Sequence, residues 1–219
     1  MATNTILTPQ ELQLAREAAE WRMISLLFEC PSDAWRAQVE ALAHELEDPE
    51  LKSAARDALR EASEGLFHHT FGPGGPAPAR EASYYQSVEL GYMMSEIQAY
   101  YTAFGFAPVT AEPVDHVSVE TAFVSYLRLK EAYALACENI ERATTTAESA
   151  ACFIEDHVAR IAAPLAGYLA NSGISYLAQA GAALARRARQ KAVAQSPFPI
   201  LQQEEPDEDV TCGSSCGEA

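Results

Sequence analysis

The densest group of ionisable side chains in the 219-residue chain lies in one nine-residue stretch, Glu-Pro-Val-Asp-His-Val-Ser-Val-Glu at residues 112–120. Pro113 fixes its own φ and favours an extended conformation at Glu112, so the stretch begins as a stiff loop. Asp115 is a favourable N-cap residue with an apolar-periodic segment after it, which predicts a helix start. Four residues separate His116 from Glu120, which places them on one face of that helix. These carboxylates suit guanidinium groups, and the imidazole is expected to titrate near neutrality.

Two other interpretations of this stretch stay open. In the structural one, Asp115 only caps the helix, Glu120 only favours its positive N-terminus and His116 is a surface residue. In the catalytic one, Glu112, Asp115, His116 and Glu120 form the site of a metal-dependent hydrolase. Helical di-metal sites usually draw ligands from several helices, often with repeated Glu-x-x-His motifs, and the sequence has no such repeat.

The charge balance narrows the classes of partner. Acidic residues outnumber basic ones by 31 to 15, for a net charge of −16. This argues against nucleic acid, which needs clustered lysine and arginine, and favours a cationic protein segment. Residues 1–8 have no signal-peptide core, and no apolar run approaches the roughly 18 residues of a membrane span, so we do not expect a membrane protein. The odd number of scattered cysteines, five, indicates reduced thiols in the cytoplasm.

The elements that must position this stretch are predicted to be helices. Apolar residues recur at steps of three and four, and no segment alternates with a period of two. We therefore expect an all-α fold, a single globular domain over residues 1–195 followed by a flexible acidic tail over 196–219. A turn is expected at Thr144–Thr146 and a kink at Pro164. The expected helices span about 9–30, 32–46, 49–62, 92–104, 117–143, 147–170 and 174–194.

A loop rich in proline and glycine precedes the acidic stretch. Residues 72–80 hold three of each and cannot form regular structure, and they lack the Gly-Lys-Ser/Thr ending of a phosphate-binding loop. Phe67 and Phe71 come before the loop, and Glu81, Tyr84 and Tyr85 follow it. Core packing is the simpler role for the aromatic residues, and a recognition groove is the alternative. A later histidine, His157, lies on an apolar helix face and is expected to be a buried, hydrogen-bonded residue.

The C-terminal tail is acidic. From residue 192 onward it has six acidic residues and neither lysine nor arginine, which predicts disorder. Cys212 and Cys216 lie within it. Two thiols are too few for a complete zinc site, so they are only weak candidates for a metal or redox role. They leave a second alternative open, a non-catalytic redox-sensing scaffold.

Taken together, the motif Glu112-Pro-x-Asp115-His116-x-x-x-Glu120 and the segments around it resemble the TorD/DmsD/NarJ family of redox-enzyme maturation chaperones. The Pro/Gly loop followed by Glu81 and Tyr84 is similar to that of the family, and so is the later Phe-x-x-x-His helix at residues 153–157. The resemblance covers about residues 12–190. One departure is Arg80, which stands where the family usually has tryptophan before the glutamate. Arg80 would repel a twin-arginine peptide, so either it points away or the peptide binds elsewhere.

The resemblance implies an all-α chaperone without catalytic activity. Such proteins bind, in the cytoplasm, the twin-arginine signal peptide and the apo form of a molybdopterin oxidoreductase catalytic subunit, and they assist cofactor insertion before export. No firmly bound cofactor is expected, and contact with molybdopterin or nucleotide would be transient. Mapped onto this sequence, the resemblance implies a client-binding site at Glu112, Pro113, Asp115, His116, Glu120, Glu81, Tyr84, Tyr85, Phe71 and Phe67. Tyr92 is a further candidate for its apolar groove.

Overall fold

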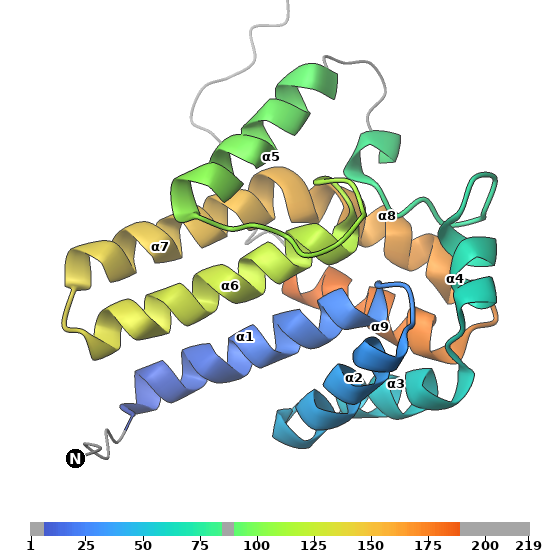
Figure 1. The fold of residues 1–219 in the computed structure, drawn as a ribbon, viewed down its shortest axis with the longest axis horizontal. Helices are drawn as coiled ribbons and strands as arrows, with labels where there is room; N and C mark the ends of the chain where they lie inside the picture. Colours follow the sequence, from blue (N-terminus) through green and yellow to red (C-terminus); the bar gives the residue numbers. More distant parts are fainter. Residues whose placement is uncertain (1–6, 85–89, 189–219) are drawn as a thin grey trace, which may run out of the picture.

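The structure, a computed structural model, describes residues 7–84 and 90–188 (Figure 1). In that part of the chain every regular element is helical, and the one extended contact is an isolated antiparallel bridge between Arg80 and His116. The predicted all-α fold is confirmed. No helix among the described residues is long and apolar enough to cross a bilayer. The elements are α1 (Pro9–Leu27), α2 (Asp33–Glu45), α3 (Pro49–Glu61), α4 (Glu64–Phe71), the 3₁₀ turn η1 (Glu81–Tyr84), α5 (Leu90–Phe104), α6 (Val117–Ala136), α7 (Ile140–Phe153), the π-helical turn η2 (Ile154–Val158), α8 (Ala159–Ala170) and α9 (Ser175–Arg187).

The first three helices start where their capping residues predicted. Thr8 and Glu11 form a capping box on α1: the Glu11 backbone N–H donates to the Thr8 hydroxyl at 3.2 Å, and the Thr8 N–H donates to the Glu11 carboxylate at 2.8 Å. Ser32 and Asp48 cap α2 and α3 more simply, through side-chain oxygens that accept backbone N–H groups of the first turn. The end of α1 was predicted three residues too late, because the chain turns at the fully buried Phe28.

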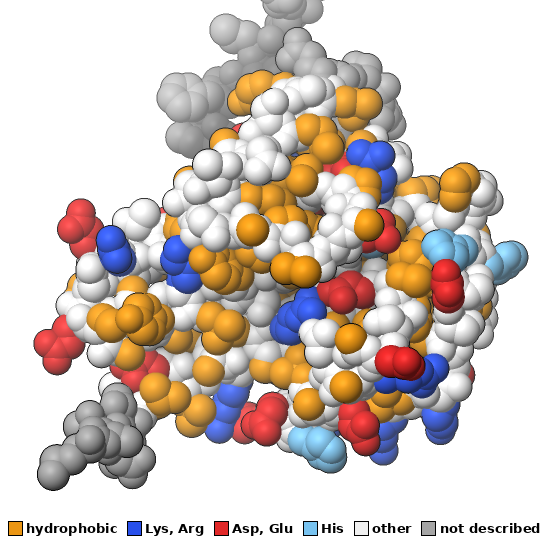
Figure 2. Space-filling view, in the orientation of Figure 1, with side chains coloured by type: hydrophobic (Ala, Val, Ile, Leu, Met, Phe, Trp, Pro, Cys, Tyr) orange, Lys and Arg blue, Asp and Glu red, His pale blue; other side chains and the backbone are white. Residues whose placement is uncertain are grey.

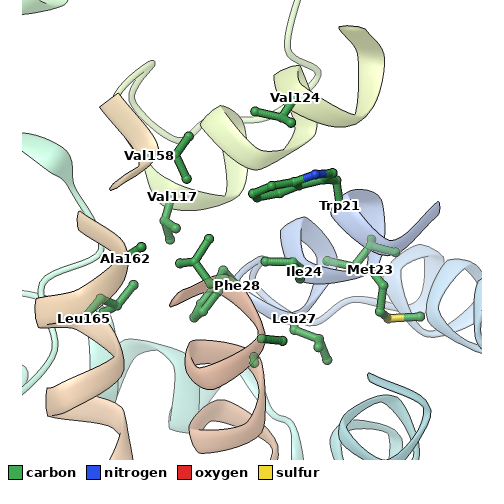
Figure 3. Close-up of a cluster of buried hydrophobic side chains, with 14 of the residues drawn as sticks. Trp21, Met23, Ile24, Leu27, Phe28, Val117, Val124, Val158, Ala162 and Leu165 are labelled. Carbon is green, nitrogen blue, oxygen red and sulfur yellow. The ribbon is translucent and has the colours of Figure 1, made fainter. Parts of the chain in front are cut away.

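Two long helices form the centre of the fold. Helices α1 and α6 lie side by side and run in opposite directions (Figure 1). Trp21 and Ile24 of α1 point toward Val117 and Val124 of α6, and Ala162 of α8 closes the cluster from another side (Figure 3). All five side chains are buried. At about 25 cal/mol per Å² of apolar area, this burial is the main stabilising contribution and fixes the start of α6 in space.

Aromatic side chains attach α5 to this centre. The Phe123 ring of α6 lies 4.8 Å from the Tyr101 ring of α5 and 4.8 Å from the Phe153 ring at the end of α7, measured between centroids. Tyr101 and Phe123 are fully buried, and the Tyr101 hydroxyl donates to the Val114 carbonyl at 2.9 Å. The tyrosine-rich helix predicted from the sequence therefore packs on the core along one face, through Met93, Ile97 and Tyr101, and Tyr92 on it is 67% exposed.

The turn predicted at Thr144–Thr146 is wrong. The chain turns at residues 137–139 instead, where Glu138 adopts a positive φ of 56° and the Asn139 side chain caps α7. Helix α6 consequently ends at residue 136 rather than 143. The threonine run lies inside α7, where the hydroxyls of Thr145 and Thr146 donate to carbonyls four residues earlier. These bonds accommodate a β-branched run within a helix.

The next predicted helix is divided. Residues predicted as one helix from 147 to 170 form the end of α7, the turn η2 and α8, with the wider π-helical turn at Ile154–Val158. Pro164 lies within α8. Such turns commonly carry functional side chains, and this one carries His157, which is buried as expected. The boundary predicted at residue 195 and the acidic tail beyond it lie outside the described residues.

Candidate functional site

Two segments distant in sequence pair to build the site. The Val117 N–H donates to the Ala79 carbonyl at 2.8 Å, and the Glu81 N–H donates to the Asp115 carbonyl at 2.9 Å. These bonds flank the bridge between Arg80 and His116. The loop after α4 is thus attached to the start of α6, and the predicted site residues of both segments come together at one corner of the molecule.

The predicted N-cap role of Asp115 is wrong. Helix α6 is capped by His116, whose Nδ1 accepts the Ser118 N–H at 3.3 Å and lies 2.7 Å from the Ser118 hydroxyl oxygen. The Asp115 carboxylate is fully buried and instead accepts hydrogen bonds from Arg80 Nε at 3.0 and 3.2 Å, and it forms an ion pair with Arg80 Nη2 at 2.9 Å. The Ala82 N–H adds a fourth contact at 3.2 Å. A two-pronged guanidinium contact is a stronger partner for this carboxylate than a helix N–H.

Behind this pair lies a buried acid cluster. Glu81 and Glu120 are fully buried, and His157 Nδ1 lies 3.1 Å from Glu81 Oε2. Burial, and then the neighbouring carboxylates of Glu81 and Asp115, raise the pKa of Glu120 well above its ordinary value. Neither Glu120 oxygen has a well-aligned hydrogen bond in the described part of the chain. The Glu81 carboxylate is nevertheless near enough to accept a hydrogen bond from the neutral Glu120 carboxyl group. The cluster is therefore an interior element, in which burial favours the neutral form of Glu120, rather than a surface charge.

The expectation that His116 titrates near neutrality is wrong. Its ring is buried, and its pKa is lowered from 6.5 to about 4, mainly by that burial; Asp115 opposes the shift and the Arg80 guanidinium adds to it. With Nδ1 accepting, the ring proton lies on Nε2, which is 3.9 Å from a Glu112 carboxylate oxygen. His116 is thus a neutral imidazole at physiological pH, whose function is to cap α6 and order the loop.

A cleft of about 530 Å³ opens beside this corner. Its wall includes five of the predicted site residues, Phe67, Phe71, Glu112, Pro113 and His116, together with Arg80 and the glycine–proline loop. The side chains of Glu112 and Arg80 are 30% and 46% exposed. The Phe67 and Phe71 rings are 5.3 Å apart, so the cleft combines an apolar side with a carboxylate and a guanidinium.

The remaining predicted site residues lie away from the cleft surface. Glu81, Asp115 and Glu120 are behind its wall. The Tyr84 hydroxyl donates to the Pro78 carbonyl at 2.6 Å, and the Tyr84 ring contacts Tyr168 rather than the cleft. Tyr92 does not line the cleft either, and Tyr85 lies outside the described residues. The sequence singled out Arg80 only as a residue that would repel a leader unless it points away. The structure places it in the cleft wall, where its guanidinium pairs with Asp115.

A second groove, of about 680 Å³, was not predicted. It lies between α1, α6 and the segment 106–110, on the face drawn in Figure 2, where hydrophobic side chains gather over these elements. Ala15, Ala19 and Ala122 line it. Small residues at helical spacing leave room between packed helices, which is the sequence signal that was overlooked.

Metal chemistry finds no support in the part of the chain that the structure describes. There, no group of three or more histidine, cysteine, aspartate or glutamate side chains is placed to hold a metal ion. The hydrolase alternative required such a group, and its four residues instead divide between the cleft surface and the interior. Cys212 and Cys216, on which the scaffold alternative depends, lie outside the described residues.

The comparisons with known proteins agree with the fold and the motif. A family model described as nitrate reductase delta subunit matches residues 30–166, which is more than half of the chain. Searches of curated proteins and of solved structures returned no match. The matched range holds the loop, the cleft residues and the motif at residues 112–120, so the resemblance stated from the sequence is confirmed. The chain belongs to the nitrate reductase delta subunit family, the NarJ/TorD-type chaperones of molybdoenzyme maturation.

Proposed function

We propose that this protein is a cytoplasmic chaperone for the catalytic subunit of a molybdopterin oxidoreductase. It binds the twin-arginine leader of the apo-subunit and assists its assembly until molybdopterin is inserted and the subunit is exported. Membership of the family supports the general role. The proposal that it binds a twin-arginine leader rests on the cleft, in which Phe67 and Phe71 lie beside the partly exposed carboxylate of Glu112.

The cleft matches the two chemical features of such a leader. Its apolar stretch packs as a helix or an extended segment on the apolar side of the cleft, where Phe71 is partly exposed and Phe67 is mostly buried behind it. One of its guanidinium groups pairs with Glu112, whose side chain is 30% exposed. The net charge of −16 accelerates the encounter with a cationic leader and makes binding sensitive to salt.

In this proposal the chaperone has no resident cofactor and no catalytic residue. Molybdopterin belongs to the client, and any contact that the chaperone makes with it, or with a nucleotide, is transient. The chemistry needed from this chain is therefore recognition and release. Its residues act by burying apolar surface and pairing with a cation, which are reversible contacts.

Isothermal titration of a synthetic twin-arginine leader into the full-length protein tests the proposal. Phe71→Ala and Glu112→Gln are each expected to weaken binding at least about fivefold, because each removes a contact at the centre of the site. Ile140→Ala and Glu155→Gln are matched controls, since both side chains are exposed and neither lines the cleft. Equal affinities for all four variants and the wild type would contradict the proposal. Co-purification from the source cell then identifies the client.

A further inference from the structure

The pair formed by Arg80 and Asp115 has the geometry of a ligand contact made within the chain. Both Asp115 oxygens are engaged by one guanidinium, through Nε at 3.0 and 3.2 Å and Nη2 at 2.9 Å. Asp115 is fully buried, whereas the Arg80 side chain is 46% exposed and forms part of the cleft wall. The carboxylate is thus covered on its cleft side by a side chain that belongs to the surface.

We propose that Arg80 is an internal competitor of the client. Its guanidinium occupies the Asp115 carboxylate, and a client arginine gains that carboxylate only by displacing Arg80 into solvent. This inference rests on the proposed function and concerns regulation of the same site: Arg80 lowers the affinity for the leader and favours its release.

The backbone allows the Arg80 side chain to leave without unfolding the corner. The segment around Arg80 is held by main-chain bonds, from Val117 N–H to the Ala79 carbonyl and from Glu81 N–H to the Asp115 carbonyl. None of these bonds uses the guanidinium. Asp115 also keeps the Ala82 N–H when the side chain departs. Displacement therefore exchanges one guanidinium for another on the same two oxygens and leaves the backbone pairing in place.

The exchange is selective for arginine. A planar guanidinium forms two parallel bonds with a carboxylate, whereas a lysine ammonium offers only a point charge and is more strongly hydrated. Lysine in the leader consequently competes poorly with Arg80. Because a competitor reduces the fraction of protein that is ready to bind, the apparent affinity falls in proportion to that fraction.

The test compares wild type with Arg80→Ala, using two leader peptides and methylguanidinium. In the variant we expect about tenfold tighter binding of the twin-arginine leader, because a partly exposed ion pair leaves the site free for on the order of a tenth of the time. The same peptide with both arginines replaced by lysine should change less than about twofold. Methylguanidinium at about ten times its dissociation constant for the variant should raise the Tm of the variant by about 3–6 °C and that of wild type by less than about 2 °C, against sodium chloride of equal ionic strength.

The outcomes separate this proposal from the proposed function. Unchanged or weaker binding of the twin-arginine leader by Arg80→Ala overturns the internal competitor, even where methylguanidinium stabilises the variant. If neither protein binds either leader, the proposed function fails, and the methylguanidinium shift alone decides whether Asp115 accepts a free guanidinium. Should Arg80→Ala fail to fold, Arg80→Lys replaces it. We expect this variant to bind the twin-arginine leader more tightly than wild type; a measured gain supports the proposal, and no gain overturns it.

Discussion

Replacing His116 by asparagine tests the electrostatics of the corner most directly. Asparagine is a preferred N-cap residue, so its side-chain oxygen can replace Nδ1 as the acceptor of the Ser118 N–H. The substitution thus keeps the cap of α6 and removes the titrating group. What it loses at neutral pH is the packing of the ring, including the contact with Phe67 at 6.5 Å between centroids.

The size of the expected change in the free energy of unfolding follows from the lowered pKa of His116. A shift from 6.5 to about 4 means that the unfolded chain takes up the proton before the folded chain does as the pH falls. Above pH 6.5 this group therefore leaves the free energy of unfolding unchanged. Between pH 6.5 and 4 it lowers that free energy progressively. At 1.36 kcal/mol per pKa unit, the loss is about 2 kcal/mol by pH 5 and about 3 kcal/mol by pH 4.

Urea unfolding followed by circular dichroism at pH 7 and pH 5 measures this loss. We expect the stability difference between wild type and His116→Asn to move by about 2 kcal/mol in favour of the variant, a shift of about 1 M in the relative midpoints. His69→Asn is the matched control, because His69 is exposed on α4 and its replacement should cost less than about 0.5 kcal/mol. If the His116→Asn difference is the same at both pH values, His116 is not shielded from protons by folding, and the argument is refuted.

Three further predictions concern the interior and the loop. Glu120→Gln should gain stability over wild type as the pH rises above about 4.5, because burial raises the pKa of Glu120 and the amide has no proton to lose; urea unfolding at pH 5 and 8 measures this. Phe123→Ala should lose about 3–5 kcal/mol in urea unfolding, since its ring is fully buried against Tyr101. In Gly75→Ala the new Cβ would lie 2.4 Å from the Thr70 carbonyl oxygen, so we expect destabilisation of about 1–3 kcal/mol by thermal denaturation and weaker leader binding by titration.

Helix starts were predictable where a single local bond decides them. Thr8, Ser32 and Asp48 each cap a helix through their own side chain, so the signal lies within four residues. The start of α7 was missed for the opposite reason. Its turn depends on Glu138 in a left-handed conformation, which is rare for a residue other than glycine, while the buried Thr146 keeps the threonine run helical through tertiary packing.

The sequence indicated which segments would lie near one another, but not which of their side chains would face the cleft. The spacing placed Glu112, Asp115 and Glu120 in one region, and the structure does bring them together. Which of the carboxylates faces the cleft depends on the pairing of residues 79–81 with 115–117, a tertiary contact without a local sequence signal. A one-residue difference in that pairing would turn the side chains to the opposite face.

In the proposed site, the charged groups of the motif have two roles: some stabilise the wall of the cleft, and one is exposed to a client. Charge in the interior is costly unless it is paired or neutralised. Asp115 is accordingly paired with Arg80, and burial raises the pKa of Glu120, which favours its neutral form beside Glu81. Asp115 is covered by Arg80 and Glu120 lies in the interior, so a leader reaches neither carboxylate while Arg80 stays in place. Among the carboxylates of the motif, only Glu112 has surface in the cleft. In the proposed mechanism, a second cation of the leader therefore binds only when Arg80 leaves the Asp115 carboxylate.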